Sequence, residues 1–359
     1  MTDSSIDLDK LKLFSFHVFS KLEGAITSGM IYLGHELGLY RALRDVGRPV
    51  SALELAETAG LDKRWVLEWA RNQAAAHILD SSDGDIFAIS AEAAMVLADS
   101  DGPAYGMGMF MRLPSTMAAL ERLPESFRSG LGYDYDAHGE TGAAGIEVNF
   151  APWFRHQLIP VGLPALDGIV DRLRTGAIVA DVGCGAGVAA LTMAAEFPQS
   201  VFHGYDISQH ALSRAIDKKA DQGLTNVHFH DPRVEPLPAD SSIDLITTFD
   251  CLHDMTHPQR VMHEIRAAIR PDGVWFVADI KARDTYAENV RKNPMASMMY
   301  GVSVMSCMAS ALSEPDGAGL GTLGMSESVL TGMAHAAGFS QVKKLAIDHA
   351  VNAFYAIRV

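Results

Sequence analysis

Three glycines and an acidic residue lie close together near the middle of the chain, in the stretch IVADVGCGAGVAALTMAAEF. Asp181 ends an apolar run, and Gly183, Gly185 and Gly187 follow before an alanine-rich segment that is typical of a helix. Glycines this close together leave the backbone uncovered, so a ligand can lie against it. A strand that passes through such glycines into a helix is where α/β sheets bind nucleotides.

A second acid, Asp206, follows at the end of the next predicted strand. A carboxylate in this place can accept hydrogen bonds from both hydroxyls of a ribose. The dinucleotide fingerprint G-x-G-x-x-G, begun at Gly183, needs glycine or alanine at the position of Val188. An NAD-dependent oxidoreductase is therefore an alternative that the glycine spacing does not favour.

Four stretches in this order resemble the motifs of class I S-adenosylmethionine-dependent methyltransferases: VADVGCGAGVA, HGYDIS, IDLITTFDCLHDM and IRPDGVWFVADI. The resemblance covers roughly residues 166–359, and the preceding region is similar to the dimerisation domain of small-molecule O-methyltransferases. It implies an α/β fold, with a Rossmann-like seven-stranded methyltransferase domain preceded by a mostly α-helical winged-helix domain. It also implies a transferase that methylates a small, largely apolar acceptor, with oxygen preferred over nitrogen or sulfur.

The resemblance assigns the cofactor contacts residue by residue. The methionine part of S-adenosylmethionine would lie against Asp181, Gly183 and Gly185, and the ribose against Asp206. The remaining contacts are Ile207 on one adenine face, Asp231 at the adenine amino group, and Cys184 and Phe249 beside the cofactor. His230 stands where many relatives have glycine, so the adenine contact is a weaker inference than the ribose contact.

The stretch FDCLHDMTHP offers groups for acid–base chemistry after the fourth predicted strand. His253 is the candidate general base because imidazole titrates near neutrality, and the adjacent carboxylate of Asp254 would orient it. A histidine that only packs beneath the cofactor loop is the alternative. Asp250, His253, Asp254 and His257 could also ligate a divalent ion if they share one helix face. Since Pro258 favours a new helix start and turns His257 away, we expect no metal.

A methionine-rich segment, NPMASMMYGVSVMSCM, separates the fifth strand from the last helix and contains Met299 and Met305. Methionines three and four residues apart usually form a helix face in a core. The alternative, which the resemblance favours, is a wall of the acceptor pocket. Phe150 and Trp153 in NFAPWFRHQ are further candidates to close that pocket, against an equally strong alternative of packing between helix and domain.

Alternating short apolar runs and amphipathic helices after residue 169 predict a parallel sheet with crossover helices. The seven predicted strands are 177–183, 201–207, 226–230, 243–249, 273–280, 342–347 and 352–359. The last two should form an antiparallel hairpin at a sheet edge. We therefore divide the chain into a winged-helix dimerisation domain at 1–100, a helical connecting region at 101–165 and the methyltransferase domain at 166–359.

The N-terminal region predicts a long apolar helix from Leu8 to about Leu43, then two short helices and a hairpin. Ser51 should cap the first short helix, which ends at Gly60, and Asp62 should open the second. The second helix would bury one side, formed by Trp65, Val66, Trp69 and Ala70. The stretch at 77–90 reads as two strands joined by a polar turn. Helix, turn, helix and hairpin make a winged helix, and the apolar first helix predicts a homodimer.

Charge and composition limit the partners of this 359-residue chain. Its formal net charge is −15, and residues 1–100 hold nine Lys or Arg against fifteen Asp or Glu, a net of −6. A DNA-reading helix would show more basic and amide groups, so we expect no nucleic acid, although a winged-helix regulator that binds S-adenosylmethionine or another small ligand remains an alternative. Three scattered cysteines, an acidic N-terminus and no membrane-length apolar run favour a cytoplasmic protein without membrane partners.

Overall fold

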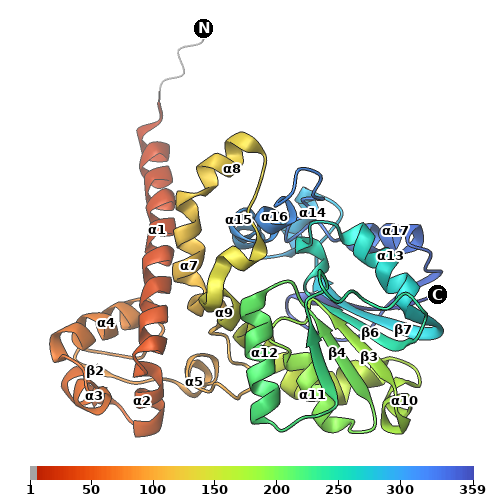
Figure 1. Ribbon diagram of the computed structural model, residues 1–359. Coiled ribbons are helices and arrows are strands. Elements are labelled where there is room, and N and C mark those ends of the chain that lie inside the picture. Colours follow the sequence, from red (N-terminus) through yellow and green to blue (C-terminus); the bar gives the residue numbers. More distant parts are fainter. Residues whose placement is uncertain (1–5) are drawn as a thin grey trace. The chain divides into compact units, whose positions relative to one another are not determined.

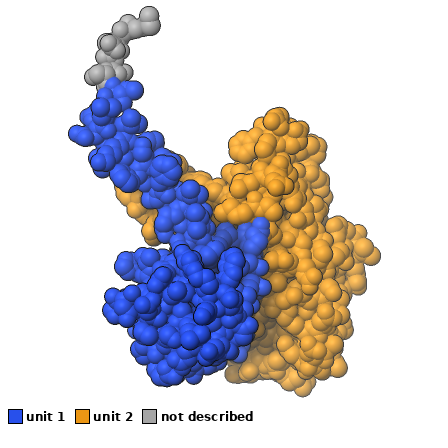
Figure 2. Space-filling model, turned by 90° about the vertical axis from the view of Figure 1, so that its left-hand side faces the viewer, with its two compact units in different colours: residues 1–114 blue, residues 115–359 orange. Residues whose placement is uncertain are grey.

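The structure is a computed structural model that describes residues 6–359. The chain divides into two compact units, residues 1–114 and residues 115–359, which Figure 2 distinguishes by colour. The predicted three-part division, with a connecting region at 101–165, stays a prediction. The first five residues of the acidic N-terminus lie outside the described part. Within residues 6–359, no helix combines the length and apolar character that crossing a membrane requires.

The first unit begins with two helices where the sequence pattern predicted one. Helix α1 spans Leu8–Glu36 and α2 spans Leu39–Val46. The prediction of a continuous helix is wrong at Gly38, whose left-handed backbone (φ +70°) separates the two. Glycine adopts this conformation without the steric cost that a side chain would bring.

The two short helices of the winged helix have the predicted caps. Helix α3 (Ala52–Ala59) ends at Gly60, and its cap Ser51 accepts a hydrogen bond from the Glu54 amide. Helix α4 (Lys63–Ala75) follows Asp62, which accepts from two amides of the first turn. Val66, Trp69 and Ala70 are buried as predicted, but Trp65 is 81% exposed. Trp65 precedes the buried stripe by one residue, which turns it away by about 100°.

The wing is smaller than the predicted hairpin. Asp80 and Ala88 form a single antiparallel bridge, and the short strand β2 (Ile86–Phe87) pairs with β1 (Val50–Ser51). The polar turn between them contains two hydrogen bonds from backbone amides to the Asp83 carboxylate, so local side-chain bonding replaces most of a ladder. The other helices up to the first strand of the large sheet are α5 (Ala91–Leu97), α6 (Gly108–Met111), α7 (Leu113–Ala118), η1 (Ala119–Glu121), α8 (Leu123–Ser129), η2 (Tyr135–His138), α9 (Gly139–Trp153), the π-helix η3 (Phe154–Gly162), η4 (Leu163–Ala165) and α10 (Ile169–Thr175).

The second unit contains a seven-stranded sheet (Figure 1), which confirms the predicted fold class. Its strands are β3 (Ile178–Val182), β4 (Val201–Tyr205), β5 (Val227–His230), β6 (Ile243–Phe249), β7 (Ile269–Ile280), β8 (Gln341–Lys344) and β9 (Asn352–Arg358). Their order is β5-β4-β3-β6-β7-β9-β8, with β9 antiparallel to both neighbours. The predicted antiparallel pair at one edge is confirmed.

Side chains alternate between the two faces of this sheet. On one face Phe276 and Phe354 pack with α10, α11 (Val188–Glu196) and residues 154–162. On the other face Trp275 and Tyr355 pack with α13 (Pro258–Ala268) and α17 (Glu327–Ala336), visible beside the sheet in Figure 1. Strands β3 to β7 are parallel, so their carboxyl ends lie along one common edge of the sheet, where polar residues can gather. The remaining helices are α12 (Gln209–Asp221), η5 (Leu252–Asp254), α14 (Tyr286–Lys292), α15 (Ala296–Met305) and α16 (Cys307–Ala311).

Candidate active site

The glycine loop between β3 and α11 has a left-handed backbone at each of its three glycines. A Cβ atom on Gly183 would lie 2.6 Å from the Cys251 sulfur, and one on Gly187 would lie 2.6 Å from the Phe229 ring. Packing therefore requires glycine at both positions. Gly185 has no atom within 4 Å of an added Cβ, so open space adjoins its backbone. This is the part of the loop that a ligand can approach. The neighbouring Cys184 thiol is buried, which raises its pKa and keeps it protonated.

Asp206 follows β4 and shapes the same loop. Its carboxylate accepts hydrogen bonds from the Gly185 amide at 2.7 Å and from the Ser208 amide at 2.8 Å. Burial raises the pKa of Asp206, and these amides oppose the rise. Each carboxylate oxygen can accept more than one hydrogen bond, so Asp206 retains capacity for ligand hydroxyls.

Asp181 is 2% exposed at the end of β3. Its Oδ1 accepts a hydrogen bond from the Thr247 hydroxyl at 2.6 Å, while Oδ2 has no protein partner among residues 6–359. Burial raises the pKa of Asp181 to about 7, an effect that the Thr247 bond opposes and the nearby Asp206 charge reinforces. A buried carboxylate oxygen without a partner is costly, and a cationic ligand group would relieve that cost.

The predicted adenine end contains groups that the sequence analysis did not identify. Asp231 accepts hydrogen bonds from Arg233 (Nε, 2.9 Å) and from Gln209 (Nε2, 2.8 Å). The Arg233 bond is the main cause that lowers the pKa of Asp231. Arg233 also donates to the Ile207 carbonyl at 2.7 Å, and the Ile207 side chain is 41% exposed. Ile207 is thus available for an aromatic face, whereas the Asp231 carboxylate is already engaged.

His253 lies in the short turn η5 after β6 and is 3% exposed. Its Nδ1 lies 2.8 Å from Oδ1 of Asp279, the penultimate residue of β7, which the sequence analysis did not select. Asp254, the expected orienting residue, has a carboxylate oxygen within 4.8 Å of a His253 ring nitrogen and of the Cys307 sulfur. Burial alone would lower the pKa of His253, but Asp279 and Cys307 outweigh it and raise the pKa well above its ordinary value. The imidazole is therefore held protonated near neutral pH.

Asp250 completes the group around His253. Its backbone is left-handed (φ +59°), and its Oδ1 accepts a hydrogen bond from the Asn352 amide at 2.6 Å. Burial, opposed by the His253 charge and reinforced by Asp279 and Asp254, raises the pKa of Asp250 to about 7. This arrangement concentrates carboxylates around a single imidazole.

The four residues considered as metal ligands do not form one group. Asp250, His253 and Asp279 bring donor atoms within 4.8 Å of one another, whereas His257 joins Glu314 and Asp316 in a separate group. His257 immediately precedes α13, whose first residue is Pro258, and so turns away as expected. The expectation of no metal stays a prediction.

The predicted acceptor residues, and Phe249 from the predicted cofactor set, make mainly packing contacts. The Trp153 ring stacks on the Phe354 ring with 4.8 Å between ring centroids. The ring centroids of Phe150 and Phe154 are 6.1 Å apart. Phe249 is 8% exposed and packs with the same aromatic cluster. Met299, 5% exposed, packs with Ile280 and Leu323, while the Met305 carbonyl accepts a hydrogen bond from the Tyr133 hydroxyl. Their role in an acceptor pocket stays a prediction.

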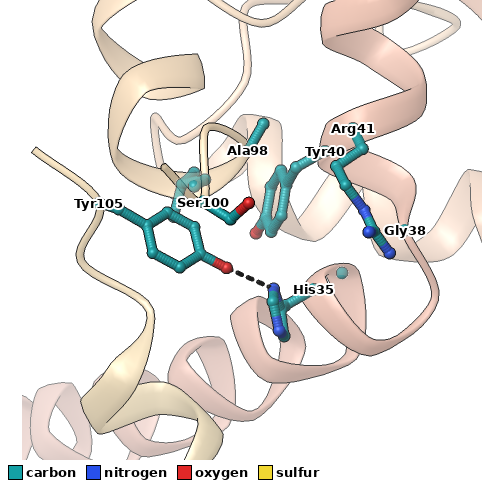
Figure 3. Close-up of a pocket in the computed structure, with 9 residues that line it drawn as sticks. His35, Gly38, Tyr40, Arg41, Ala98, Ser100 and Tyr105 are labelled. Carbon is teal, nitrogen blue, oxygen red and sulfur yellow. Dashed lines mark hydrogen bonds between the residues drawn. The ribbon is translucent and has the colours of Figure 1, made fainter. Parts of the chain in front are cut away.

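Two cavities lie away from these groups. One of about 50 Å³ is in the first unit, where the Tyr105 hydroxyl lies 3.2 Å from His35 Nδ1 (Figure 3). It has room for one or a few water molecules but is far below the roughly 300 Å³ at which ligand pockets begin. The other, about 640 Å³, is a polar groove lined by the loop residues Ala282, Arg283 and Asp284 and by residues of α14, α17 and β8, among them Lys344. Neither is lined by Asp181, Asp206 or His253, so chemistry rather than cavity size identifies the candidate site.

Two families match parts of the chain. Residues 173–337 match a family described as "Methyltransferase domain", and residues 25–99 match the "Rv2258c-like winged HTH domain". Residues 173–337 thus form a methyltransferase domain, preceded by a winged helix–turn–helix domain.

Curated relatives match over a limited region. A ubiquinone biosynthesis O-methyltransferase of Neisseria meningitidis is 28% identical over 127 residues, covering 35% of this chain and 52% of that protein. The methyltransferase GfsG of Streptomyces halstedii is 35% identical over 132 residues, covering 36% of this chain and 47% of that protein. The chain spans about half the length of the curated relatives it matches.

Solved structures match the whole fold at low identity. A putative O-methyltransferase of Nostoc punctiforme has a TM-score of 0.73 at 15% identity, covering 95% of this chain and 98% of its own. Human N-acetylserotonin methyltransferase in complex with S-adenosylmethionine has a TM-score of 0.68 at 17% identity, covering 100% and 99%. These likenesses show the fold, including the N-terminal helical part.

Proposed function

We propose that this chain, whose residues 173–337 form a methyltransferase domain, transfers the methyl group of S-adenosylmethionine to a small, largely apolar acceptor, preferably at oxygen. The observation that carries the proposal is the meeting of Asp181, Gly185 and Asp206 at the carboxyl ends of β3 and β4. This edge adjoins β6, where the strand order reverses, and such switch points bind ligands in open α/β sheets.

The chain offers a matching group for each part of the cofactor. Asp181 has a buried, unpartnered oxygen for the α-ammonium group, and Gly185 leaves open backbone beside it. Asp206 retains acceptor capacity for the ribose hydroxyls, and the exposed Ile207 side chain can cover an adenine face. We propose that Cys184 and Phe249 line the same site and that Asp231, bonded to Arg233, orders its adenine end.

When bound, S-adenosylmethionine would supply a methyl group on a positively charged sulfur. The protein must then align the acceptor hydroxyl for in-line attack and remove its proton as the oxygen–methyl bond forms and the sulfur–methyl bond breaks. His253 is the proposed base, with Asp279 holding its Nδ1. Because Asp279 favours the protonated imidazole, His253 must lose its own proton before it can act as the base. The neutral imidazole can then accept the proton of the acceptor hydroxyl.

Calorimetric titration tests the cofactor assignment without knowledge of the acceptor. S-adenosylhomocysteine should bind to the full chain, and NAD should not compete. Absence of binding, or tighter binding of NAD, would contradict the proposal. A screen of phenols, amines and thiols, with S-adenosylhomocysteine release as the readout, would then identify the acceptor class; methylation of RNA or protein alone would overturn the small-molecule assignment.

The winged helix–turn–helix match leaves a DNA-binding regulator as the second candidate. On α4, Arg64 pairs with Glu68, and the exposed Trp65 occupies the same surface. The unit's negative charge also opposes binding to a phosphate backbone. A gel shift at low ionic strength distinguishes the two: salt-sensitive DNA binding would support the regulator.

A homodimer through α1 is part of the proposal. Phe14, Phe19 and Leu22 on α1 are 65%, 67% and 56% exposed. Further exposed apolar residues of this helix are Leu8, Leu11, Leu13, Phe16, Val18, Ile26 and Leu33. An apolar surface of this extent usually lies in an interface, and a second copy would bury it. Light scattering on the full chain should give twice the monomer mass.

We also propose a cytoplasmic location. Cys184, Cys251 and Cys307 are all unpaired thiols in the described structure. Unpaired cysteines fit a reducing compartment better than a secreted protein. Fractionation of expressing cells, with antibody detection, would test this location.

A further inference from the structure

One segment of the predicted connecting region contacts both the cofactor side and the acceptor side of the candidate site. We call residues 132–138, between α8 and α9, the strap. The Gly132 amide donates to the Leu312 carbonyl at 2.7 Å, and the Tyr133 amide donates to the Ala309 carbonyl at 3.0 Å. A Cβ atom on Gly132 would lie 1.8 Å from the Ala309 oxygen, so only glycine permits this approach. The strap therefore rests directly on the residues that follow the methionine-rich segment.

The end of the strap contacts the acceptor side of the site. His138 is 8% exposed, and its Nε2 lies 3.1 Å from the Ser306 hydroxyl. The rings of Tyr133 and Tyr135 meet the His138 ring edge-on at 5.5 and 5.8 Å. Ser306 directly precedes Cys307, the neighbour of the proposed base. These contacts fix the strap beside the groups that would receive the acceptor.

The middle of the strap contacts the cofactor side. Oδ1 of Asp136 accepts a hydrogen bond from the Ser208 hydroxyl at 2.5 Å. Ser208 is 3% exposed, and its backbone amide donates to Asp206, the proposed ribose ligand. The charge of Asp136 is also close enough to raise the pKa of Asp206, although burial is the main cause and the Ser208 and Gly185 amides oppose it. A single carboxylate thus joins the strap to the ribose-binding loop.

We propose that Asp136 is a positioning residue that couples cofactor binding to assembly of the acceptor side. Through Ser208 it holds the strap on the ribose-binding loop, while Tyr133 and His138 hold the same strap on residues 305–312. This inference rests on the proposed function, because it assumes that Asp206 binds the ribose of S-adenosylmethionine.

The coupling has a simple electrostatic reason. In the empty site the Asp136 and Asp206 carboxylates are neighbours and repel each other. Ribose hydroxyls that donate to Asp206 would reduce this repulsion. A bound cofactor therefore favours the closed strap, by which we mean the strap held on the ribose-binding loop through the bond between Asp136 and Ser208. By linkage, a closed strap raises cofactor affinity by the same factor. The cofactor should accordingly bind before the acceptor.

Three substitutions separate this role from general effects on structure. Asp136→Ala removes the acceptor of the Ser208 hydrogen bond, whereas Asp136→Asn keeps an oxygen that can accept it. Glu140→Ala removes an exposed carboxylate just beyond the strap and serves as the charge-matched control. All three are compared with the unmodified full chain.

Two measurements report the coupling. The first is the dissociation constant of S-adenosylhomocysteine by calorimetry, and the second is the rate of chymotryptic cleavage after Tyr133 and Tyr135, with and without S-adenosylhomocysteine. In the wild type we expect the ligand to slow these cleavages severalfold. Asp136→Ala should weaken binding by about tenfold, the usual worth of a hydrogen bond to a charged group, and should lose most of the protection. Glu140→Ala should behave as the wild type. Asp136→Asn keeps the Ser208 bond but lacks the charge that repels Asp206, so it should bind S-adenosylhomocysteine at least as tightly as the wild type and show less ligand-dependent change in cleavage.

Equal protection and equal affinity in Asp136→Ala would overturn the inference, as would an equal loss in Glu140→Ala. A wild type that binds no S-adenosylhomocysteine would instead contradict the proposed function itself. Should Asp136→Ala fold poorly, Ser208→Ala removes the same bond from the other side. Ser208→Ala must then reproduce the loss of protection at Tyr133 and Tyr135, and failure to do so would refute the coupling.

Discussion

Replacement of Asp206 by alanine tests the cofactor site most directly. The carboxylate holds two backbone amides of its own loops, at 2.7 and 2.8 Å, and in our proposal also binds both ribose hydroxyls. A hydrogen bond to a charged acceptor is worth about 1.5–3 kcal/mol, so two ribose bonds supply about 3–6 kcal/mol. Since 1.4 kcal/mol is a factor of ten, and the loop will partly readjust, we expect affinity for S-adenosylhomocysteine to fall by about 10²–10³-fold.

The assay is calorimetric titration of each variant, with thermal melting as the check on folding. Asp231→Ala is the matched control: its carboxylate is already engaged by Arg233 and Gln209, so its loss should cost about tenfold or less. An analogue of S-adenosylhomocysteine with a 2′-deoxyribose sharpens the test. The wild type should bind this analogue about tenfold more weakly than S-adenosylhomocysteine. Asp206→Ala should bind the analogue and S-adenosylhomocysteine with equal affinity. If folded Asp206→Ala binds the parent compound as the wild type does, the ribose assignment is wrong.

Four further predictions follow from the same structure. His253→Ala should lower turnover by about 10²–10⁴-fold, the usual worth of a positioned base, with little change in S-adenosylhomocysteine affinity; an unchanged rate would make His253 a packing residue. Because the raised pKa keeps His253 protonated, the wild-type kcat/KM should rise with pH through that pKa, and Asp279→Asn should move this rise to lower pH; a profile unmoved by Asp279→Asn would exclude the pair. Phe14→Asp combined with Phe19→Asp should convert the dimer to a monomer by light scattering, and a persistent dimer would place the interface elsewhere. Burial raises the pKa of Asp181 to about 7, so the ligand-free wild type should lose stability as pH rises from about 4 towards 7; Asp181→Asn should melt higher than the wild type at pH 8 but equally at pH 4, while losing S-adenosylhomocysteine binding.

The sequence alone predicted the structure correctly where the interactions that determine it are local. The caps at Ser51 and Asp62 bond to amides within three residues, and the strand pattern around Asp181 depends on its own apolar run. The length of the hairpin at 77–90 was overestimated. The Asp83 carboxylate in its turn accepts hydrogen bonds from nearby backbone amides, so few hydrogen bonds form between the two strands. Trp65 was misassigned because a shift of one residue moves a helical side chain off the buried stripe.

The partners that complete the site come from distant parts of the chain. Asp279 meets His253 only because β6 and β7 are parallel neighbours that end at the same edge. Asp254, next to His253 in sequence, was the natural choice without that topology. The contact between Asp136 and Ser208 spans 72 residues and joins an irregular segment, for which periodicity provides no signal. Arg233 was missed although it lies two residues from Asp231, because nothing in its type distinguishes a local ion pair from a ligand contact.

The charge of the site bears on which nucleotide it can accept. Asp181, Asp206, Asp250 and Asp279 lie at the ends of four adjacent strands, the last two beside the His253 imidazole, and burial raises the pKa of Asp181 and of Asp250 to about 7. Without a ligand, such a site holds protons in place of counter-ions, because several unbalanced buried carboxylates are costly. A ligand with an ammonium group and a sulfonium would supply positive charge, whereas the pyrophosphate of NAD would add negative charge to the same place. After methyl transfer the sulfur is neutral, so the attraction that favours the methyl donor weakens for the product and assists its release.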